Sequence, residues 1–193
     1  MTQGTGVALA DMLVPTYRQM LGCLARLLDK ARDQRGAEDV EALLAARLAP
    51  DMFPLTTQLR FCCVQALEGV SRLAGTELPP QTAVLLEEGR NAGDNPGTLA
   101  AAQARIAETL AWLESIDPAT LDCAPDRAIA HELPNGMVFD FTAEQYVRDW
   151  ALPQFNFHLM AAYAILRAQG IELGKADYVA HLFPLLRSDT PPG

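Results

Sequence analysis

The stretch that most constrains the fold is Thr142 to Gly170, TAEQYVRDWALPQFNFHLMAAYAILRAQG. Thr142 and Gln145 fit a capping box, in which each side chain satisfies a backbone donor left open in the first helical turn. Gly170 supplies the left-handed residue that commonly ends a helix. The pattern therefore predicts one long helix. Its predicted apolar face has three-, four- and seven-residue spacing and comprises Tyr146, Trp150, Phe157, Ala161, Ala164 and Ala168.

Pro153 interrupts this helical pattern. Proline lacks the backbone donor and crowds the carbonyl four residues earlier, here that of Asp149. Because apolar residues continue on both sides, we expect a kink at Pro153 rather than the end of the helix.

The rest of the chain predicts an all-α fold. Apolar residues at helical spacing predict three further long helices, at 8–33, 55–74 and 98–116, which with the last helix form a four-helix bundle. The connection 76–97 is long for a bundle and contains a short apolar stretch, 82–90, that predicts one small helix. We expect a single domain over 1–193. Its minor elements are a short segment at 37–48, a C-terminal helix at 176–183 and a loose tail at 187–193.

A β-hairpin is predicted at 127–141, between the third and fourth helices of the bundle. Two partly alternating runs flank Asn135-Gly136, a dipeptide typical of two-residue hairpin turns. Met137, Phe139 and Phe141 would face the helices, whereas His131 in the first arm would face solvent.

The net charge of −9, from 15 basic and 24 acidic residues, argues against binding to a phosphate backbone, so no nucleic-acid partner is expected. No run approaches the roughly 20 apolar residues of a membrane span, and the first residues lack the pattern of a signal peptide. We therefore expect no membrane association and a cytoplasmic location. The four cysteines form no CxxC pair and are expected to be reduced and mostly buried.

His158 is the one histidine that the sequence singles out for chemistry. It lies beside the predicted apolar face, one turn after Gln154. One interpretation is a partly buried histidine hydrogen-bonded within the core. The other is a metal ligand or proton-transfer group, but a second ligand on the same helix would stand three or four residues away, and position 154 is a glutamine.

Two local patterns carry a family resemblance: LLAARLAPDMFPLTTQL at 43–59 and LPQFNFHLMAAYAILRAQGIELGKADY at 152–178. Together with the order of helices, they resemble a bacterial domain-of-unknown-function family assigned to the DinB-like (YfiT-like) superfamily. The resemblance covers nearly the whole chain. It implies a DinB-like four-helix bundle with a small β-hairpin between helices 3 and 4.

The resemblance also implies a site. Many DinB-like proteins hold a divalent metal with three histidines, one from the second helix and two from the fourth, and some use it to activate a small thiol. The fourth-helix pattern H-x-x-x-H-R-G-Q places Gln154 and His158 at its two histidines. The second-helix pattern S-x-x-E-x-x-x-H runs approximately through Leu55, Gln58 and Cys62, so one histidine of three is retained.

The candidate pocket therefore consists of Gln58, Cys62, Gln154 and His158, with His158 as the candidate metal ligand and no residue assigned as catalytic. Glutamine is a weak neutral ligand, so this set does not make a normal zinc or nickel site. No cofactor is expected, with a divalent metal as the open alternative.

The leading hypothesis is a homodimeric bundle with a degenerate metal site, non-catalytic or binding a small ligand. The alternative is a metal- or thiol-dependent transferase or isomerase of the DinB-like kind, which could use Cys62 and His158 as a nucleophile–base pair. A third possibility is an interaction module built on the 76–97 connection and the C-terminal helix.

Overall fold

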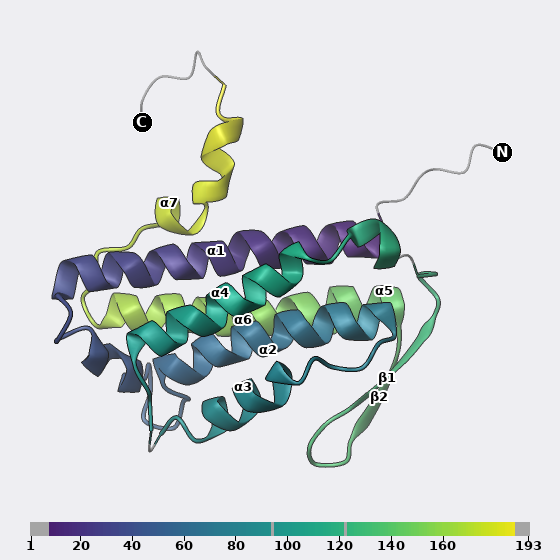
Figure 1. Ribbon diagram of the computed structural model, residues 1–193, viewed down its shortest axis with the longest axis horizontal. Helices are drawn as coiled ribbons and strands as arrows, with labels where there is room; N and C mark the ends of the chain where they lie inside the picture. Colours follow the sequence, from purple (N-terminus) through teal and green to yellow (C-terminus); the bar gives the residue numbers. More distant parts are fainter. Residues whose placement is uncertain (1–7, 94, 122, 188–193) are drawn as a thin grey trace.

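Four long helical rods form the body of the protein in a computed structural model that describes residues 8–187 except 94 and 122 (Figure 1). The rods are α1 (Leu9–Arg35), α2 (Leu55–Ala74), α4 (Leu99–Glu114) and a last rod made of α5 (Ala143–Gln145), the π-helix η3 (Tyr146–Ala151) and α6 (Leu152–Ala168). The predicted all-α bundle is confirmed, with α3 lying outside α2 as an added helix (Figure 1).

Shorter elements connect and cover the rods. They are η1 (Glu41–Ala45), α3 (Gln81–Arg90), η2 (Pro118–Leu121), α7 (Lys175–Tyr178), η4 (Ala180–Leu185) and a two-stranded hairpin of β1 (Ala128–Glu132) and β2 (Val138–Thr142). The strands are antiparallel, with Ala128 opposite Thr142 and Glu132 opposite Val138. The hairpin thus lies between α4 and the last rod, where the sequence predicts it.

Local signals set the ends of α2. Pro54 precedes its first residue with an extended backbone, and Gly75 ends it in the left-handed conformation at φ 70°. The amide of Gly75 donates to carbonyls of the last turn, which are otherwise left without intrahelical partners. The core face of α2 has helical spacing, and its members are all buried: Leu59, Cys63, Ala66, Val70 and Leu73.

The capping box at the start of the last rod is also confirmed. The Gln145 amide donates to Thr142 Oγ1 over 3.2 Å, and the Thr142 amide donates to Gln145 Oε1 over 2.9 Å. The rod continues through Pro153 without stopping. The rod departs from α-helical geometry just before the proline, over the π-segment Tyr146–Ala151. At the end of this segment the Leu152 amide donates a hydrogen bond to the Val147 carbonyl, five residues earlier.

The predicted apolar face of this rod is wrong at Phe157 and Ala168, whereas Ala161 is buried as predicted. Phe157 is 60% exposed and Ala168 is exposed, whereas Phe155 is fully buried. The physical reason is the π-segment, because a turn closed by i→i+5 bonds holds one more residue than an α turn and rotates everything after it. The residues that α6 buries are Phe155, His158, Leu159, Ala161, Ala162, Ile165 and Leu166.

The prediction for His131 is wrong as well, since this side chain is only 3% exposed. Strand residues two apart share a face, and in β1 the buried positions are Ile129 and His131. His131 packs on Trp150 and Tyr146, with ring centroids 4.6 and 5.8 Å apart. Phe139 and Phe141 contact Trp150 as expected, but Met137 is 51% exposed.

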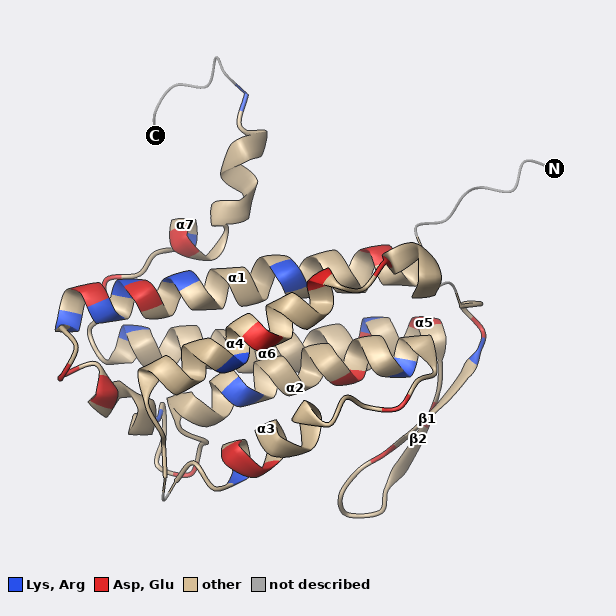
Figure 2. Cartoon of the chain, viewed as in Figure 1, with Lys and Arg blue, Asp and Glu red and all other residues tan. Residues whose placement is uncertain are grey.

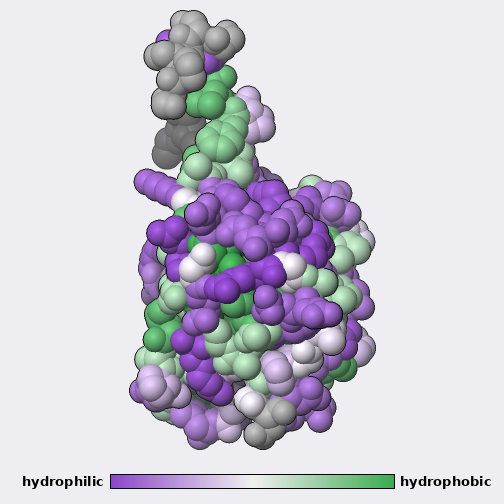
Figure 3. Space-filling view, turned by 90° about the vertical axis from the view of Figure 1, so that its left-hand side faces the viewer, coloured by the Kyte–Doolittle hydropathy of each residue, from purple (hydrophilic) through white to green (hydrophobic). Residues whose placement is uncertain are grey.

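The C-terminal elements stand out from the body. Figure 3 shows a largely apolar segment rising from a mostly hydrophilic face, and η4 carries no charged residue (Figure 2). Its exposed apolar side chains include Leu182, Phe183 and Leu185. The predicted loose tail at 187–193 lies outside the described residues from 188 onward. Among the described helices, none is both long and apolar enough to cross a membrane.

Candidate functional site

Helix α2 presents two faces to its surroundings. One face packs into the core. The other lines a partly open cavity of about 630 Å³ bounded by α2, α3, the hairpin and the last rod. The α2 residues in the cavity wall recur at helical spacing and are Phe61, Val64, Gln65, Glu68 and Arg72.

The other walls come from elements far apart in the sequence. α3 contributes Leu86 and Arg90, and the hairpin contributes His131 and Glu132. A volume of this size suits a small organic molecule, since ligand pockets span roughly 300 to 1,000 Å³. The last rod and two connecting segments supply the rest of the lining: Trp150, His158, Phe53, Leu133 and Pro134.

His158 is the candidate residue that the structure places in the wall. Its Nδ1 lies 2.8 Å from Gln58 Oε1, a buried contact between α6 and α2. The Gln58 amide nitrogen donates to the Phe53 carbonyl over 3.3 Å, which turns the amide oxygen toward the ring. An amide oxygen can only accept, so His158 carries its proton on Nδ1, which leaves a lone pair on Nε2 that can accept a hydrogen bond.

The imidazole of His158 is neutral near pH 7. The side chain is 9% exposed, and this burial lowers the pKa of His158 to about 4. Phe61 packs edge-on against the ring, with centroids 5.2 Å apart. A nitrogen this weakly basic is a poor general base at neutral pH, but it accepts a hydrogen bond well.

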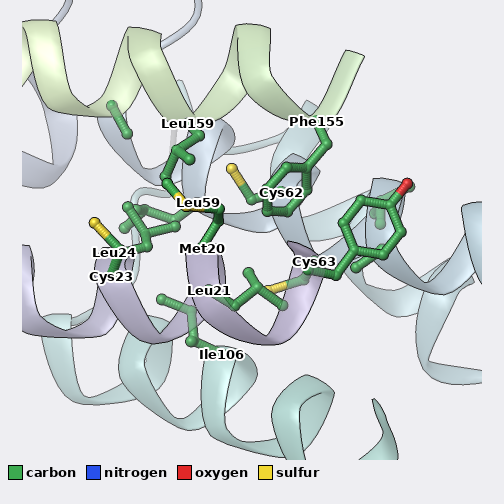
Figure 4. Packing of buried hydrophobic residues seen from close by; sticks show 14 of the residues in the cluster. Met20, Leu21, Cys23, Leu24, Leu59, Cys62, Cys63, Ile106, Phe155 and Leu159 are labelled. Carbon is green, nitrogen blue, oxygen red and sulfur yellow. The ribbon is translucent and has the colours of Figure 1, made fainter. Parts of the chain in front are cut away.

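Cys62 is placed differently. It lies in the apolar core beside Phe155 and Leu59, as Figure 4 shows, and it is fully buried. Burial, together with the neighbouring Cys63, raises the pKa of the Cys62 thiol well above its usual value. Cys62 and the partly exposed Gln154 are not part of the cavity wall in the described structure. Such a buried, protonated thiol lacks the features of an activated nucleophile.

The donor set does not fit a conventional divalent metal. A structural or catalytic zinc site needs three or four nitrogen, sulfur or carboxylate ligands around one point. Within residues 8–187, leaving out 94 and 122, no group of three or more His, Cys, Asp or Glu side chains is arranged to hold an ion. The family pattern has a second histidine four residues before His158, at position 154. This position is a glutamine here, so His158 has no histidine one turn earlier on the same helix.

Sequence reasoning missed three residues at the hairpin end of the cavity: Arg72, His131 and Trp150. A signal for Arg72 was present, because Phe61, Gln65, Glu68 and Arg72 follow one another at steps of four, three and four. For His131 the signal was its spacing of two from Ile129.

Comparisons with known proteins support one family. The model for a domain of unknown function, DUF1993, matches residues 9–179. The crystal structure of a DinB family member protein from Shewanella denitrificans is similar, with a TM-score of 0.71 and 32% sequence identity over 95% of this chain and 96% of that chain. No curated protein matches the chain. The chain thus belongs to the domain-of-unknown-function family DUF1993 and has a DinB-like fold.

Proposed function

We propose that this protein binds a small organic molecule in the cavity between α2, α3, the hairpin and the last rod, without a resident divalent metal. The observation that carries the proposal is His158, which lines a cavity of about 630 Å³ and whose ring is held from behind by Gln58. A neutral ring with a defined acceptor atom fixes the orientation of a ligand, while aromatic side chains supply contact area.

The aromatic end of the cavity contains Phe53 and Phe61, whose ring centroids lie 5.7 Å apart in an edge-on arrangement. Phe53 is 50% exposed although it is a large apolar side chain. A ligand placed against Phe53 and Phe61 would remove apolar surface from water, which contributes roughly 25 cal/mol for each Å² buried.

The thiol-dependent transferase alternative has weaker support. It requires a thiolate beside His158, whereas Cys62 is in the core with its thiol pKa raised by burial. The donor set likewise gives no support for metal activation of a substrate thiol.

Ligand binding can be tested by recording amide ¹H–¹⁵N spectra while adding neutral ring amides of increasing size: benzamide, 2-naphthamide and indole-3-acetamide. We expect shifts at cavity residues such as Gln65 and Leu133, and none along the first turns of α1. The matched variants are Gln65→Trp, which fills the cavity, and Gln65→Ala, which leaves it open. Saturable shifts in wild type and Gln65→Ala, absent from Gln65→Trp, would support the proposal.

The same protein preparation tests the absence of a resident metal. We expect well under one equivalent of zinc, nickel or iron by elemental analysis after dialysis. A stoichiometric metal that is lost in His158→Gln would contradict this part of the proposal.

A further inference from the structure

Helix α6 is apolar on the side that faces solvent as well as on the side that faces the core. No charged residue occurs between Asp149 and Arg167, a stretch that covers almost all of α6. A helix that is apolar all round is normally enclosed by other protein. Its outer face has exposed or partly exposed residues at steps of four, three and four, which we call the α6 stripe: Pro153, Phe157, Met160 and Ala164.

Two large side chains of the α6 stripe are open to water. Phe157 is 60% exposed and Met160 is 44% exposed. Alternating steps of four and three are those of the seam along which two helices pack against each other. Among the described residues that line the cavity, none belongs to the α6 stripe, so this surface is separate from the proposed ligand site.

A second apolar surface lies beside the stripe. After α7 the chain leaves the body as residues 179–186, VAHLFPLL, which we call the arm (Figures 1 and 3). At the base of the arm, Tyr178 packs edge-on against Tyr163 of α6, with ring centroids 6.2 Å apart. Because Tyr163 follows Met160 by three residues, the arm begins next to the stripe. Its large exposed side chains are Leu182, Phe183, Leu185 and Leu186.

The stripe and the arm together expose a large apolar area for a single chain. Their six large apolar side chains are 44–80% exposed and present on the order of 500 Å² of apolar surface. This area is at the upper end of what single chains expose, and such surfaces are often interaction sites. With a polar rim it approaches the roughly 800 Å² per partner that a specific interface buries.

The charges favour a second copy of this chain as the partner. The net charge of −9 disfavours nucleic acid, and neither the stripe nor the arm contains the Lys or Arg that holds amphipathic segments on a membrane surface. Two copies of an acidic chain also repel each other. They can approach most closely where neither carries a charge, and the stripe and the arm are surfaces of this kind.

Opposite charges at the two ends of the stripe make it complementary to its own copy. Glu144, Arg148 and Asp149 precede the stripe with a net charge of −1, and Arg167 follows it. A two-fold axis across the stripe makes the two α6 helices antiparallel, so the basic end of each copy approaches the acidic end of the other. A parallel arrangement would place like charges together.

We propose that two copies of this chain associate through α6, antiparallel about an axis near Phe157 and Met160, with each arm lying on the other copy. Because the interface is small and both copies are acidic, we expect a dissociation constant on the order of 10 µM. At about 1 µM the chain is then mostly monomeric, so unfolding measured at that concentration reports on the single chain.

Sedimentation velocity of the full chain at about 1 to 200 µM tests the association, because this range brackets the expected dissociation constant. We expect the weight-average mass to rise from that of one chain toward that of two. A mass that stays at one chain over the whole range would overturn the proposal.

Met160→Glu and Met160→Lys test whether α6 meets its own copy. Each variant should raise the dissociation constant at least about tenfold, because a residue near the two-fold axis faces its counterpart and like charges repel. An equimolar mixture of the two variants should associate again, since opposite charges then face each other. Met12→Glu is the matched control, because Met12 on α1 is also 44% exposed. It should associate like wild type.

Phe183→Ser tests the arm and should raise the dissociation constant several-fold by removing apolar contact. Its control is Val84→Ser on α3, where the side chain is 44% exposed against 49% for Phe183. The control should associate like wild type. Unfolding midpoints measured at about 1 µM, where the single chain predominates, show that each variant is folded.

Each further outcome decides one part of the proposal. A dimer that persists unchanged in Met160→Glu uses another surface, which would overturn the proposal. If the two charged variants stay apart when mixed, the α6 helices do not meet. If Phe183→Ser associates like wild type, the arm is not in the interface. A chain that stays monomeric but co-sediments with phosphatidylcholine vesicles, and loses this binding in Phe183→Ser, would replace the second copy by a membrane.

Discussion

The two faces of helix α2 differ in how completely the rest of the protein buries their side chains and pairs their polar atoms. On the core face, Leu59, Cys62 and Cys63 are at most 1% exposed and pack among apolar side chains (Figure 4). On the cavity face, Gln65 and Glu68 are half-buried and Arg72 keeps an unpaired Nε. The comparison teaches that one helix can serve stability on one side and leave polar side chains available on the other, where we propose that a ligand binds.

Within helix α2, the largest expected effect comes from the core face. Leu59→Ala should lower the free energy of unfolding by about 2 to 5 kcal/mol, because it removes a fully enclosed side chain and leaves a cavity. Its matched control on the other face is Gln65→Ala, which should change that free energy by less than about 0.5 kcal/mol. Urea titrations of both variants measure the difference. Equal losses would show that the two faces are not distinct.

The next effect is a pH dependence from the two buried histidines. Burial lowers the folded-state pKa of His131 and of His158 to about 4, from an ordinary value of 6.5. Between these values the unfolded chain binds more protons than the folded chain. The histidines therefore contribute full stability above pH 6.5 and lose it as the pH falls toward 4, by up to about 1.4 kcal/mol per pH unit for each ring.

Urea midpoints measured from pH 7.5 to 5 test this prediction above the range in which most carboxylates titrate. His158→Gln and His131→Gln should each remove part of the slope, and the double variant should remove most of it. A wild-type midpoint that stays constant over this range would mean that both rings remain hydrated in the folded protein.

The smallest expected effect concerns the last rod. Phe157→Ala should change the free energy of unfolding by less than about 0.5 kcal/mol, because Phe157 is 60% exposed. Phe155→Ala is the matched change two residues away, at a fully buried ring packed on Tyr17 with centroids 4.8 Å apart. It should cost about 3 to 5 kcal/mol. If Phe157→Ala cost more stability than Phe155→Ala, the buried face of the last rod would be the one predicted from the residue spacing, and the face described here would be wrong.

Much of the fold follows from local sequence signals. The proline before α2 and the glycine after it determine the ends of that helix through contacts within a few residues. The Thr142–Gln145 capping box and the Asn135-Gly136 turn act equally locally on the start of the last rod and on the hairpin. The contact between Gln58 and His158 brings together two members of the predicted pocket, although the two residues are 100 positions apart. For the site, the sequence could therefore predict the neighbourhood of His158.

The rest depends on interactions that no local pattern contains. The face of α6 was mispredicted because the π-segment changes the helical phase between Tyr146 and Phe155. Cys62 was assigned to the pocket by its position in the motif, but the rotation of α2 directs it into the core. Arg72, His131 and Trp150 meet only once the hairpin folds back onto α2 and the last rod.

The wide turn at Tyr146–Ala151 has a consequence for how this segment can vary. Ala143, Val147, Ala151 and Phe155 are all buried at steps of four, a spacing that drifts by about 40° per step on an ordinary α-helix. Loss of one residue from this turn would restore an ordinary helix and swing α6 by about 100° relative to the hairpin. The segment should therefore tolerate replacement of its exposed side chains, Arg148 and Asp149, but no change in its length.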